Sequence, residues 1–319
     1  MSFHIDDNGV GPLKHGDLME FLNGPFSVVL NRAFDVRKSV LGWELLCVFP
    51  GGSTLPLSLS GKECTQGCLH CNGHYLNSMT SIDTLLKHLE QNPEDVPDSV
   101  LISGGCLSDM RMPIVERAED IRTLRRAGIS TNFHVALPTS DDIDLILELA
   151  DVVSLDFVSD PEVARRVFRT ARASRGGFED LYQRLQGRVR VVPHICIGLD
   201  NGRTGWEYQA LSVLSELGVG TVTLNVIRPT AGTEFEKVSL PPLADVARIF
   251  AAARLLMPGA AIGIGCMRPG GAWRRKMDNL CLMAGADRIV SPLPVTLEFA
   301  QQMGLYVTPF DKCCAFPSI

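Results

Sequence analysis

The segment Cys64-Thr-Gln-Gly-Cys68-Leu-His-Cys71 places three thiols on one short stretch of chain. It follows an apolar run that ends near 57–59. A loop of this length can curl around a cube of iron and sulfide, and thiolate is the ligand that iron–sulfur clusters use. Three thiolates leave one iron of a 4Fe-4S cluster without a protein ligand, and a catalytic cluster needs such an open iron. The segment therefore predicts a catalytic 4Fe-4S cluster held by Cys64, Cys68 and Cys71.

Two other kinds of metal protein stay open as alternatives. A structural zinc site needs four protein ligands, and this segment supplies three cysteines plus, at best, His70 or His74. A non-catalytic iron–sulfur scaffold or electron carrier is the other alternative, although such a carrier prefers four cysteine ligands. Both alternatives predict cluster or metal binding without catalysis.

Composition limits the class of protein. The chain has 319 residues, of which 45% are hydrophobic and 21% charged, so it can supply a large core. The net charge of −6 argues against a nucleic-acid partner and against an anionic membrane surface. No apolar run reaches the ~18 residues that a bilayer span requires. Ten cysteines without an export signal favour a reducing compartment, so we expect a cytoplasmic protein.

Short apolar runs alternate with amphipathic segments along most of the chain. Strands are expected at 55–59, 99–103, 130–135, 151–157, 189–197, 221–226 and, as the last one, 261–265. Helices are expected at 81–91, 115–127, 140–150, 160–170, 178–188, 204–217 and 243–257. Repeated strand–helix units indicate a parallel sheet, so the predicted class is α/β, a full or partial (β/α) TIM-type barrel.

The predicted organisation has three parts. Residues 1–54 form an N-terminal extension with two helices between 16 and 46, residues 55–290 form the barrel, and residues 291–319 close its mouth. Functional groups of such barrels gather where the strands end at their carboxyl termini. Candidate residues follow the expected strands at that end: Cys64–Cys71, Gly104, Gly105, Cys106, His134, Asp156, Asn225, Arg228, Cys266 and Arg268. Asn132, His134 and Asp156, taken singly, are also typical of satisfied core groups.

The C-x3-C-x2-C pattern resembles the signature of the radical S-adenosylmethionine (SAM) superfamily. In that family SAM chelates the open iron, and an electron from the cluster cleaves it to a 5′-deoxyadenosyl radical. The resemblance places Gly104 and Gly105 at the glycine-rich segment that receives the SAM ammonium group, although a glycine pair also permits simple close packing. It makes His134, Arg175, Asn225 and Arg228 further candidates for the SAM pocket.

The C-terminal third resembles biotin-synthase-like proteins. The segment Asn225-Val-Ile-Arg-Pro-Thr-Ala-Gly-Thr-Glu is similar to a sixth-strand motif of that branch, and 279–289 is similar to its Cys-Phe-Met-Ala-Gly-Ala-Asn-x-Ile segment. The turn Gly265-Cys-Met-Arg268 places Arg268 on an arginine that ligates the auxiliary cluster of biotin synthase. The segment 279–289 is expected to form a helix and a strand that buttress the barrel, so Cys281 is expected in the core. Val192 stands where biotin synthase has another cluster cysteine.

The order of these segments and the closing Cys313-Cys314 pair look most similar to two-component, archaeal-type lipoyl synthases. That resemblance implies sulfur insertion into an octanoyl chain on a lipoyl carrier domain, together with a second radical SAM protein and with reduced ferredoxin or flavodoxin as electron donor. Cys266, Cys313 and Cys314 are the predicted ligands of an auxiliary iron–sulfur cluster. The alternative is another biotin-synthase-like reaction, either sulfur insertion into a small molecule or a radical rearrangement.

Overall fold

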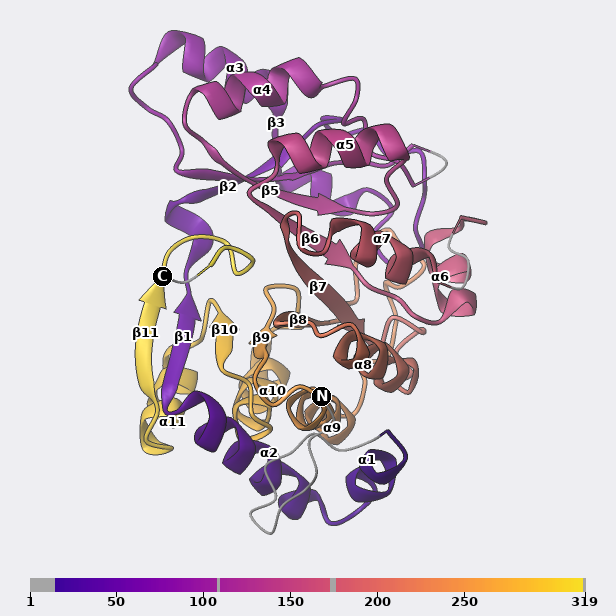
Figure 1. Cartoon of the computed structure of the whole chain (residues 1–319), viewed down its shortest axis with the longest axis vertical. Coiled ribbons are helices and arrows are strands. Elements are labelled where there is room, and N and C mark those ends of the chain that lie inside the picture. Colours follow the sequence, from indigo (N-terminus) through magenta and orange to yellow (C-terminus); the bar gives the residue numbers. More distant parts are fainter. Residues whose placement is uncertain (1–14, 108–109, 173–175, 318–319) are drawn as a thin grey trace. The chain divides into compact units, whose positions relative to one another are not determined.

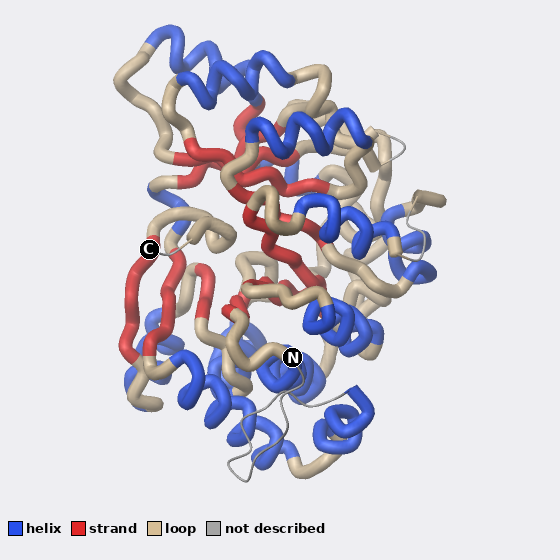
Figure 2. The backbone as a smooth tube through the Cα atoms, viewed as in Figure 1, coloured by secondary structure: helices blue, strands red, loops and turns tan. Residues whose placement is uncertain are grey.

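Strands and helices alternate along most of the chain in the computed structural model, which describes residues 15–107, 110–172 and 176–317 (Figures 1 and 2). Its contacts divide the chain into two units. Unit 1 comprises the described parts of Met1–Val48, Ile195–Arg228 and Ser239–Phe310, and unit 2 comprises those of Phe49–His194, Pro229–Val238 and Asp311–Ile319. Both units consist of parallel strands and helices, which confirms the predicted α/β class of TIM-type folds.

Unit 2 contains a parallel sheet in the strand order β7-β6-β5-β4-β2-β3. Its strands are β2 (Thr54–Ser58), β3 (Thr80–Ser81), β4 (Ser99–Ser103), β5 (Ser130–Val135), β6 (Val152–Asp156) and β7 (Arg190–Ile197), which continues into unit 1. Its helices are α3 (Ile82–Gln91), α4 (Ala118–Arg126), α5 (Ser140–Leu149), α6 (Pro161–Phe168) and α7 (Gly177–Leu185), with short turns η1 (Pro50–Gly52) and η2 (His74–Ser78). The predicted strands and helices of this region are confirmed.

Local sequence explains where several helices of unit 2 begin. Ser81 accepts a hydrogen bond from the backbone N–H of Thr84, which caps α3. Thr139 and Asp142 form a reciprocal capping box at the start of α5. Asp160 accepts hydrogen bonds from two backbone N–H groups at the start of α6. These caps fix the helix starts, and therefore the connections that follow the strands.

Unit 1 contains the parallel strand order β11-β1-β10-β9-β8. The strands are β1 (Glu44–Val48), β8 (Thr221–Val226), β9 (Ala261–Ile264), β10 (Arg288–Val290) and β11 (Tyr306–Phe310). The helices are α1 (His15–Leu22), α2 (Phe26–Leu41), α8 (Trp206–Glu216), α9 (Leu243–Leu256), α10 (Gly271–Met283) and α11 (Pro294–Gln302). Helix α9 is buried along most of its length, and contacts α2, α8 and α10.

Two expectations for unit 1 were wrong. The second N-terminal helix does not continue to residue 46, because α2 ends at Gly42 (φ 76°) and 44–48 form strand β1 between β10 and β11. The strand at 261–264 is not the last, because the strand expected within 279–289 is present as β10 and a further strand, β11, follows it. None of the helices in the described ranges is long and apolar enough to cross a membrane.

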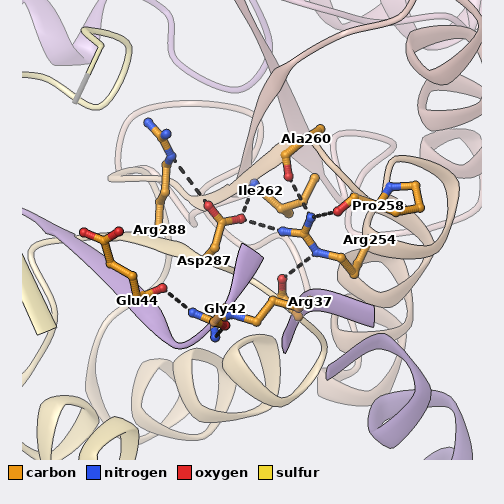
Figure 3. A network of polar contacts seen from close by, with 10 residues as sticks. Arg37, Gly42, Glu44, Arg254, Pro258, Ala260, Ile262, Asp287 and Arg288 are labelled. Atoms are coloured by element: carbon orange, nitrogen blue, oxygen red, sulfur yellow. Dashed lines mark hydrogen bonds and ion pairs between the residues drawn. The ribbon is translucent and has the colours of Figure 1, made fainter. Parts of the chain in front are cut away.

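A buried ionic network joins the helices and strands of unit 1 (Figure 3). Arg254 is fully buried, and its Nη2 donates to Asp287 Oδ1 at 2.5 Å. Its other guanidinium nitrogens donate to the carbonyls of Gly285, Pro258 and Ala260. Arg37 of α2 is also fully buried, and it donates to the carbonyls of Gly42 and Glu44. The Arg254 group thereby ties α9 to the residues at the starts of β9 and β10, and Arg37 separately ties α2 to the start of β1.

Candidate active site

The cysteine loop, defined as 59–73, leaves the carboxyl end of β2 and is held by backbone hydrogen bonds to the segment that follows β4. Leu59 N–H donates to Ser103 O at 2.9 Å, and Thr65 N–H donates to Cys106 O at 3.0 Å. The backbone has positive φ at Gly67 (63°) and Gly73 (74°), a conformation that glycine adopts without steric cost. The loop therefore curls tightly, with all three cysteines on it.

The glycine pair after β4 has a packing role. A Cβ on Gly105 would lie 1.8 Å from Glu63 O and 2.7 Å from Cys64 Cα. The Gly105 N–H also donates to Ser60 Oγ at 2.7 Å. The backbone of the cysteine loop therefore passes directly over Gly105, and no larger residue fits there. The packing interpretation of this glycine has geometric support, and the predicted contact of Gly104 and Gly105 with SAM stays a prediction.

The loop also contacts the end of α6. Gln66 donates through Nε2 to Phe168 O at 2.6 Å, and its Oε1 accepts from Met110 N–H at 2.9 Å. Leu69 N–H donates to Val167 O at 2.9 Å. The His70 ring stacks edge-on against Phe168, with centroids 5.7 Å apart. These contacts fix the loop from a second side, so its thiols are held in place by surrounding structure.

The thiols of the loop interact with one another and with His70. A hydrogen bond between the side chains of Cys68 and Cys71 raises the pKa of Cys68 and lowers the pKa of Cys71. Burial lowers the pKa of His70, but the hydrogen bond to Cys71 and the charges of Cys71 and Asp156 together outweigh burial and raise it. The buried Nδ1 of His70 has no hydrogen-bond partner among the described residues. The loop thus favours a thiolate at Cys71, the form in which cysteine binds iron.

The donor set of this loop fits an iron–sulfur cluster. Cys64 and Cys71 are partly exposed and Cys68 is buried, so the loop offers three soft sulfur ligands beside solvent. Within the described ranges, no group of three or more His, Cys, Asp or Glu side chains is arranged around a single metal ion. A 4Fe-4S cube binds each thiolate to a different iron, so its ligands need not converge on one point.

Three ionisable side chains of neighbouring strands form a second group, here called the histidine cluster: His134, Asp156 and His194. His134 Nε2 lies 3.4 Å from Asp156 Oδ1, and the two histidine rings are 5.7 Å apart. His194 Nδ1 is 2.9 Å from Val192 O, so Nδ1 carries the proton that it donates. The register explains the grouping, since His134 pairs with Ser154 and Asp156 pairs with His194, on the same side of the sheet.

The three residues of the histidine cluster differ in the direction of their pKa shifts. Burial opposes charge on both members of the His134–Asp156 pair, but their mutual attraction prevails, so the pKa of His134 is raised and that of Asp156 is lowered. Burial and the nearby His134 charge lower the pKa of His194 to about 4. His194 is therefore neutral at pH 7, with Nε2 as an acceptor. Asp156 is among the residues expected at a strand end, where it is also typical of a satisfied core group, and His194 is not among the predicted site residues. The available sequence signal for His194 was the alternation of side chains along the buried strand 190–197, in which every second residue faces the same side.

The C-terminal segment lies elsewhere than predicted. Cys313 N–H donates to Thr54 Oγ1 at 2.9 Å, and Arg190 Nε donates to Ala315 O at 3.0 Å. Thr54 begins β2 and Arg190 begins β7, so this segment contacts the amino ends of the strands. The cysteine loop leaves β2 at its carboxyl end. The expected closure of the same mouth is therefore corrected for unit 2: the described tail lies against the opposite end of the sheet.

Cys313 also contacts the interior side of this sheet. Asn132 Nδ2 donates to Cys313 Sγ at 3.3 Å. The pKa of Cys313 is lowered, first by a hydrogen bond from Cys314 and then by the Ala315 N–H, Asn132 and the charge of His134, against the opposing effect of burial. The tail thus brings a thiolate-favouring cysteine to the side of the strands that carries the histidine cluster. Both tail cysteines are predicted ligands, whereas Asn132 is expected only as a satisfied core group.

The remaining predicted residues lie in unit 1 or outside the described residues. Asn225 Oδ1 accepts from Met267 N–H at 3.2 Å at the carboxyl end of β8, and exposed Cys266 follows β9. Arg268 is 3% exposed and donates to both carboxylate oxygens of Asp278, which gives it a structural role. Arg228 is exposed, Cys281 is buried as expected, and Arg175 lies outside the described residues.

No protein-family model matches the chain. It is 23% identical over 251 residues to the biotin synthase of Vesicomyosocius okutanii, covering 73% of this chain and 74% of that protein. The structure of the FeFe-hydrogenase maturase HydG from Carboxydothermus hydrogenoformans matches with a TM-score of 0.69 at 14% identity, covering 94% of this chain and 77% of HydG. Methylornithine synthase (PylB) matches with a TM-score of 0.63 at 18% identity, covering 93% and 94%.

The structural matches are too dissimilar in sequence to show more than a shared fold. The sequence similarity to biotin synthases covers most of the chain. Together with the fold, it supports the radical SAM superfamily as the class of this protein. Within that class, it supports the biotin-synthase-like branch. The homologues imply a 4Fe-4S cluster and SAM as cofactors.

Proposed function

We propose that this protein inserts sulfur into an octanoyl chain carried by a lipoyl domain, acting with a second radical SAM protein. The observation that carries the proposal is the pairing of two thiol groups in unit 2. One is the three-cysteine loop at the carboxyl ends of the strands, and the other is the Cys313–Cys314 pair at their amino ends. The first group suits radical generation, and the second suits a sulfur source.

The catalytic cofactors have candidate residues in both units. Cys64, Cys68 and Cys71 hold the 4Fe-4S cluster, and Gly104 and Gly105 lie directly beside them. SAM bound to such a cluster supplies a carbon radical, which can abstract hydrogen from an unactivated C–H bond. The other residues proposed to contact SAM are His134, Arg175, Asn225 and Arg228.

The residues of the chain have roles of their own in this proposal. Gly105 allows the cysteine loop to approach β4, which sets the position of the loop. The ion pair with Asp156 orients the His134 ring, and the attraction of Asp156 raises the pKa of His134 against the effect of burial. His194 presents a neutral acceptor beside it. The pair can orient polar groups of SAM or of the substrate arm without transferring a proton to the reacting carbon.

An auxiliary iron–sulfur cluster is proposed as the sulfur source, with Cys266, Cys313 and Cys314 as ligands. Val192 replaces the cysteine that biotin synthase has on this strand, so the sulfur must be held differently. The lowered pKa of Cys313 and its contact with Asn132 favour a metal-binding thiolate. Cys313 and Cys314 belong to unit 2 and Cys266 to unit 1, so the tail cysteines are the members of this set that share a unit.

Iron content tests the auxiliary site. The triple variant Cys64→Ala, Cys68→Ala, Cys71→Ala should still retain iron and sulfide after anaerobic reconstitution. Adding Cys313→Ala and Cys314→Ala should remove that remaining iron. A triple variant without iron would contradict the auxiliary site and leave an enzyme with one cluster.

Mass spectrometry of an octanoylated carrier peptide tests the function itself. This protein alone should cleave SAM and complete at most one sulfur insertion, and addition of its paired homologue should give the lipoyl product. The Cys71→Ala variant serves as the control for radical dependence. Conversion of dethiobiotin, with no mass change of the octanoyl peptide under any combination, would reassign the substrate.

A second candidate is a radical rearrangement of a small molecule. The fold match to methylornithine synthase covers 94% of that protein, nearly its whole length, which shows a shared architecture. The iron assay above separates the two candidates, because a rearrangement needs no second cluster. Retained iron in the triple variant therefore favours sulfur insertion.

A further inference from the structure

An arginine-rich surface adjoins the cysteine loop. Residues 161–188 contain seven arginines and three acidic residues, a local excess of positive charge in a chain whose net charge is −6. Four of these arginines, here called the arginine patch, are exposed on α6 and on the connection that follows it: Arg165, Arg166, Arg169 and Arg172. Figure 1 shows α6 beside α7 in unit 2.

The arginine patch contacts the loop that is proposed to hold the catalytic cluster. Arg169 has a left-handed backbone (φ 52°) at the end of α6, and its Nη1 would lie 3.6 Å from a Cβ on Gly67. Its backbone carbonyl accepts from Gln66 Nε2 at 3.2 Å. The carbonyls of Val167 and Phe168 accept the hydrogen bonds described above. The patch and the cysteine loop are therefore adjoining parts of one surface of unit 2.

Two acidic side chains that pair with the patch are largely exposed to water. Glu162 pairs with Arg165, and Glu234 pairs with Arg169, with side-chain exposures of 70% and 61%. Pairs exposed to this degree are weak, because water screens them. An incoming acidic surface can therefore displace them at low cost. The excess of arginine over acid along 161–188 remains after both pairs are counted.

We propose that the arginine patch is the docking surface for a small acidic electron-carrier protein that reduces the catalytic cluster. This inference rests on the proposed radical SAM function, which requires one electron from outside the chain. The carrier loses that electron and the cluster held by Cys64, Cys68 and Cys71 gains it, with no bond made or broken. Opposite charge steers the encounter, and electron-transfer complexes need only small interfaces.

Charge reversal with two reductants tests the docking surface. The double variant Arg165→Glu, Arg166→Glu should lower the second-order rate of SAM cleavage driven by flavodoxin hydroquinone by roughly tenfold or more at low salt. Its rate with dithionite-reduced methyl viologen should equal that of the unmodified protein, because this small cation needs no acidic docking surface. The viologen rate also shows that the variant is folded and carries its cluster.

The matched control changes the same number of charges elsewhere in unit 2. Lys87 of α3 and Arg126 of α4 are exposed and belong to helices on another part of the sheet. Lys87→Glu with Arg126→Glu should leave the flavodoxin-driven rate within about twofold of the unmodified protein, since steering depends on charge near the contact. As a second measurement, added salt should slow flavodoxin-driven cleavage by the unmodified protein much more than by the patch variant.

Three outcomes would overturn the inference. One is an unchanged flavodoxin-driven rate in the patch variant, and another is an equal loss in the patch variant and the control. The third is a normal flavodoxin rate with weakened use of the octanoylated carrier under viologen, which would assign the patch to the substrate protein. A failure of the proposed function is distinct, since the unmodified protein would then form no 5′-deoxyadenosine with either reductant.

Discussion

The buried Arg254 of unit 1 and the cysteine loop of unit 2 differ in how their polar groups are satisfied. Arg254 reaches one carboxylate and three carbonyls, so every guanidinium nitrogen has a partner of the protein itself. In the cysteine loop, Cys68, Cys71 and His70 interact mainly with one another, and His70 Nδ1 has no partner within the described residues. The fully hydrogen-bonded guanidinium of Arg254 stabilises the fold, whereas the cysteine loop keeps its sulfur and imidazole groups available for a ligand.

This comparison predicts that substitutions in the two regions affect different measured quantities. Variants of the cysteine loop should remove activity while the apoprotein unfolds much as before. Variants of the Arg254 group should lower the free energy of unfolding while the remaining folded molecules stay active. The four predictions below are ordered from the largest expected effect to the smallest.

Loss of any loop cysteine should have the largest effect. Cys64→Ala, Cys68→Ala and Cys71→Ala should each reduce 5′-deoxyadenosine formation to background, because each removes a proposed ligand of the catalytic cluster. Liquid chromatography of anaerobic reactions measures the product. Cys281→Ala is the control, since Cys281 is buried against Met277 in unit 1 and should lose stability but keep activity. Parental activity in any loop variant would break the comparison.

Removal of Asp287 should have the largest effect on stability. Asp287→Ala leaves the buried Arg254 charge without its carboxylate, which typically costs about 3–5 kcal/mol. Urea unfolding of the apoprotein measures the change. The control is Asp200→Ala, which breaks an ion pair with the mostly exposed Arg203 and should cost at most ~1 kcal/mol. An equal loss of unfolding free energy in the two variants would show that burial does not determine how much the pair of Arg254 and Asp287 stabilises the fold.

The histidine cluster should make stability depend on pH. The folded pKa of His194 is about 4, whereas the unfolded value is 6.5. Between these two pH values the unfolded chain binds a proton at His194, whereas the folded chain does not. The free energy of unfolding therefore decreases as the pH falls from 6.5 towards 4, by up to about 3 kcal/mol. His194→Gln should lose this dependence. If the free energy of unfolding of the variant and of the parent changed equally between these pH values, the buried neutral state of His194 would be contradicted.

A methyl group on Gly105 should give the smallest effect on stability, yet impair the loop. Gly105→Ala forces the cysteine loop away from β4, because the new Cβ would overlap Glu63 O. Overpacking of this kind costs about 1–3 kcal/mol. Iron content after reconstitution should fall with it. Gly51→Ala is the control, since nothing lies within 4 Å of its Cβ position. Normal iron content in the Gly105 variant would show that the loop tolerates displacement.

Part of the molecule could be predicted from local patterns. The alternation of strands and helices from β2 to β9 follows from runs of apolar residues and from caps such as Thr139–Asp142. Strand β1 was missed because its apolar run directly follows a helix, although Gly42 was an available stop signal. Strand β11 was missed because it contains a proline and is only partly buried, so it lacks the usual apolar signal.

The sequence by itself determined the spacing of Cys64, Cys68 and Cys71, because a short loop keeps neighbouring residues together whatever the rest of the chain does. Only the tertiary structure decided which distant groups meet. Asn132 reaches Cys313, and Arg254 reaches Asp287, across separations that leave no local pattern. The tail could be expected near the strands, but its place at their amino ends depends on hydrogen bonds to Thr54 and Arg190. Such contacts follow from strand register and packing, which a linear pattern does not encode.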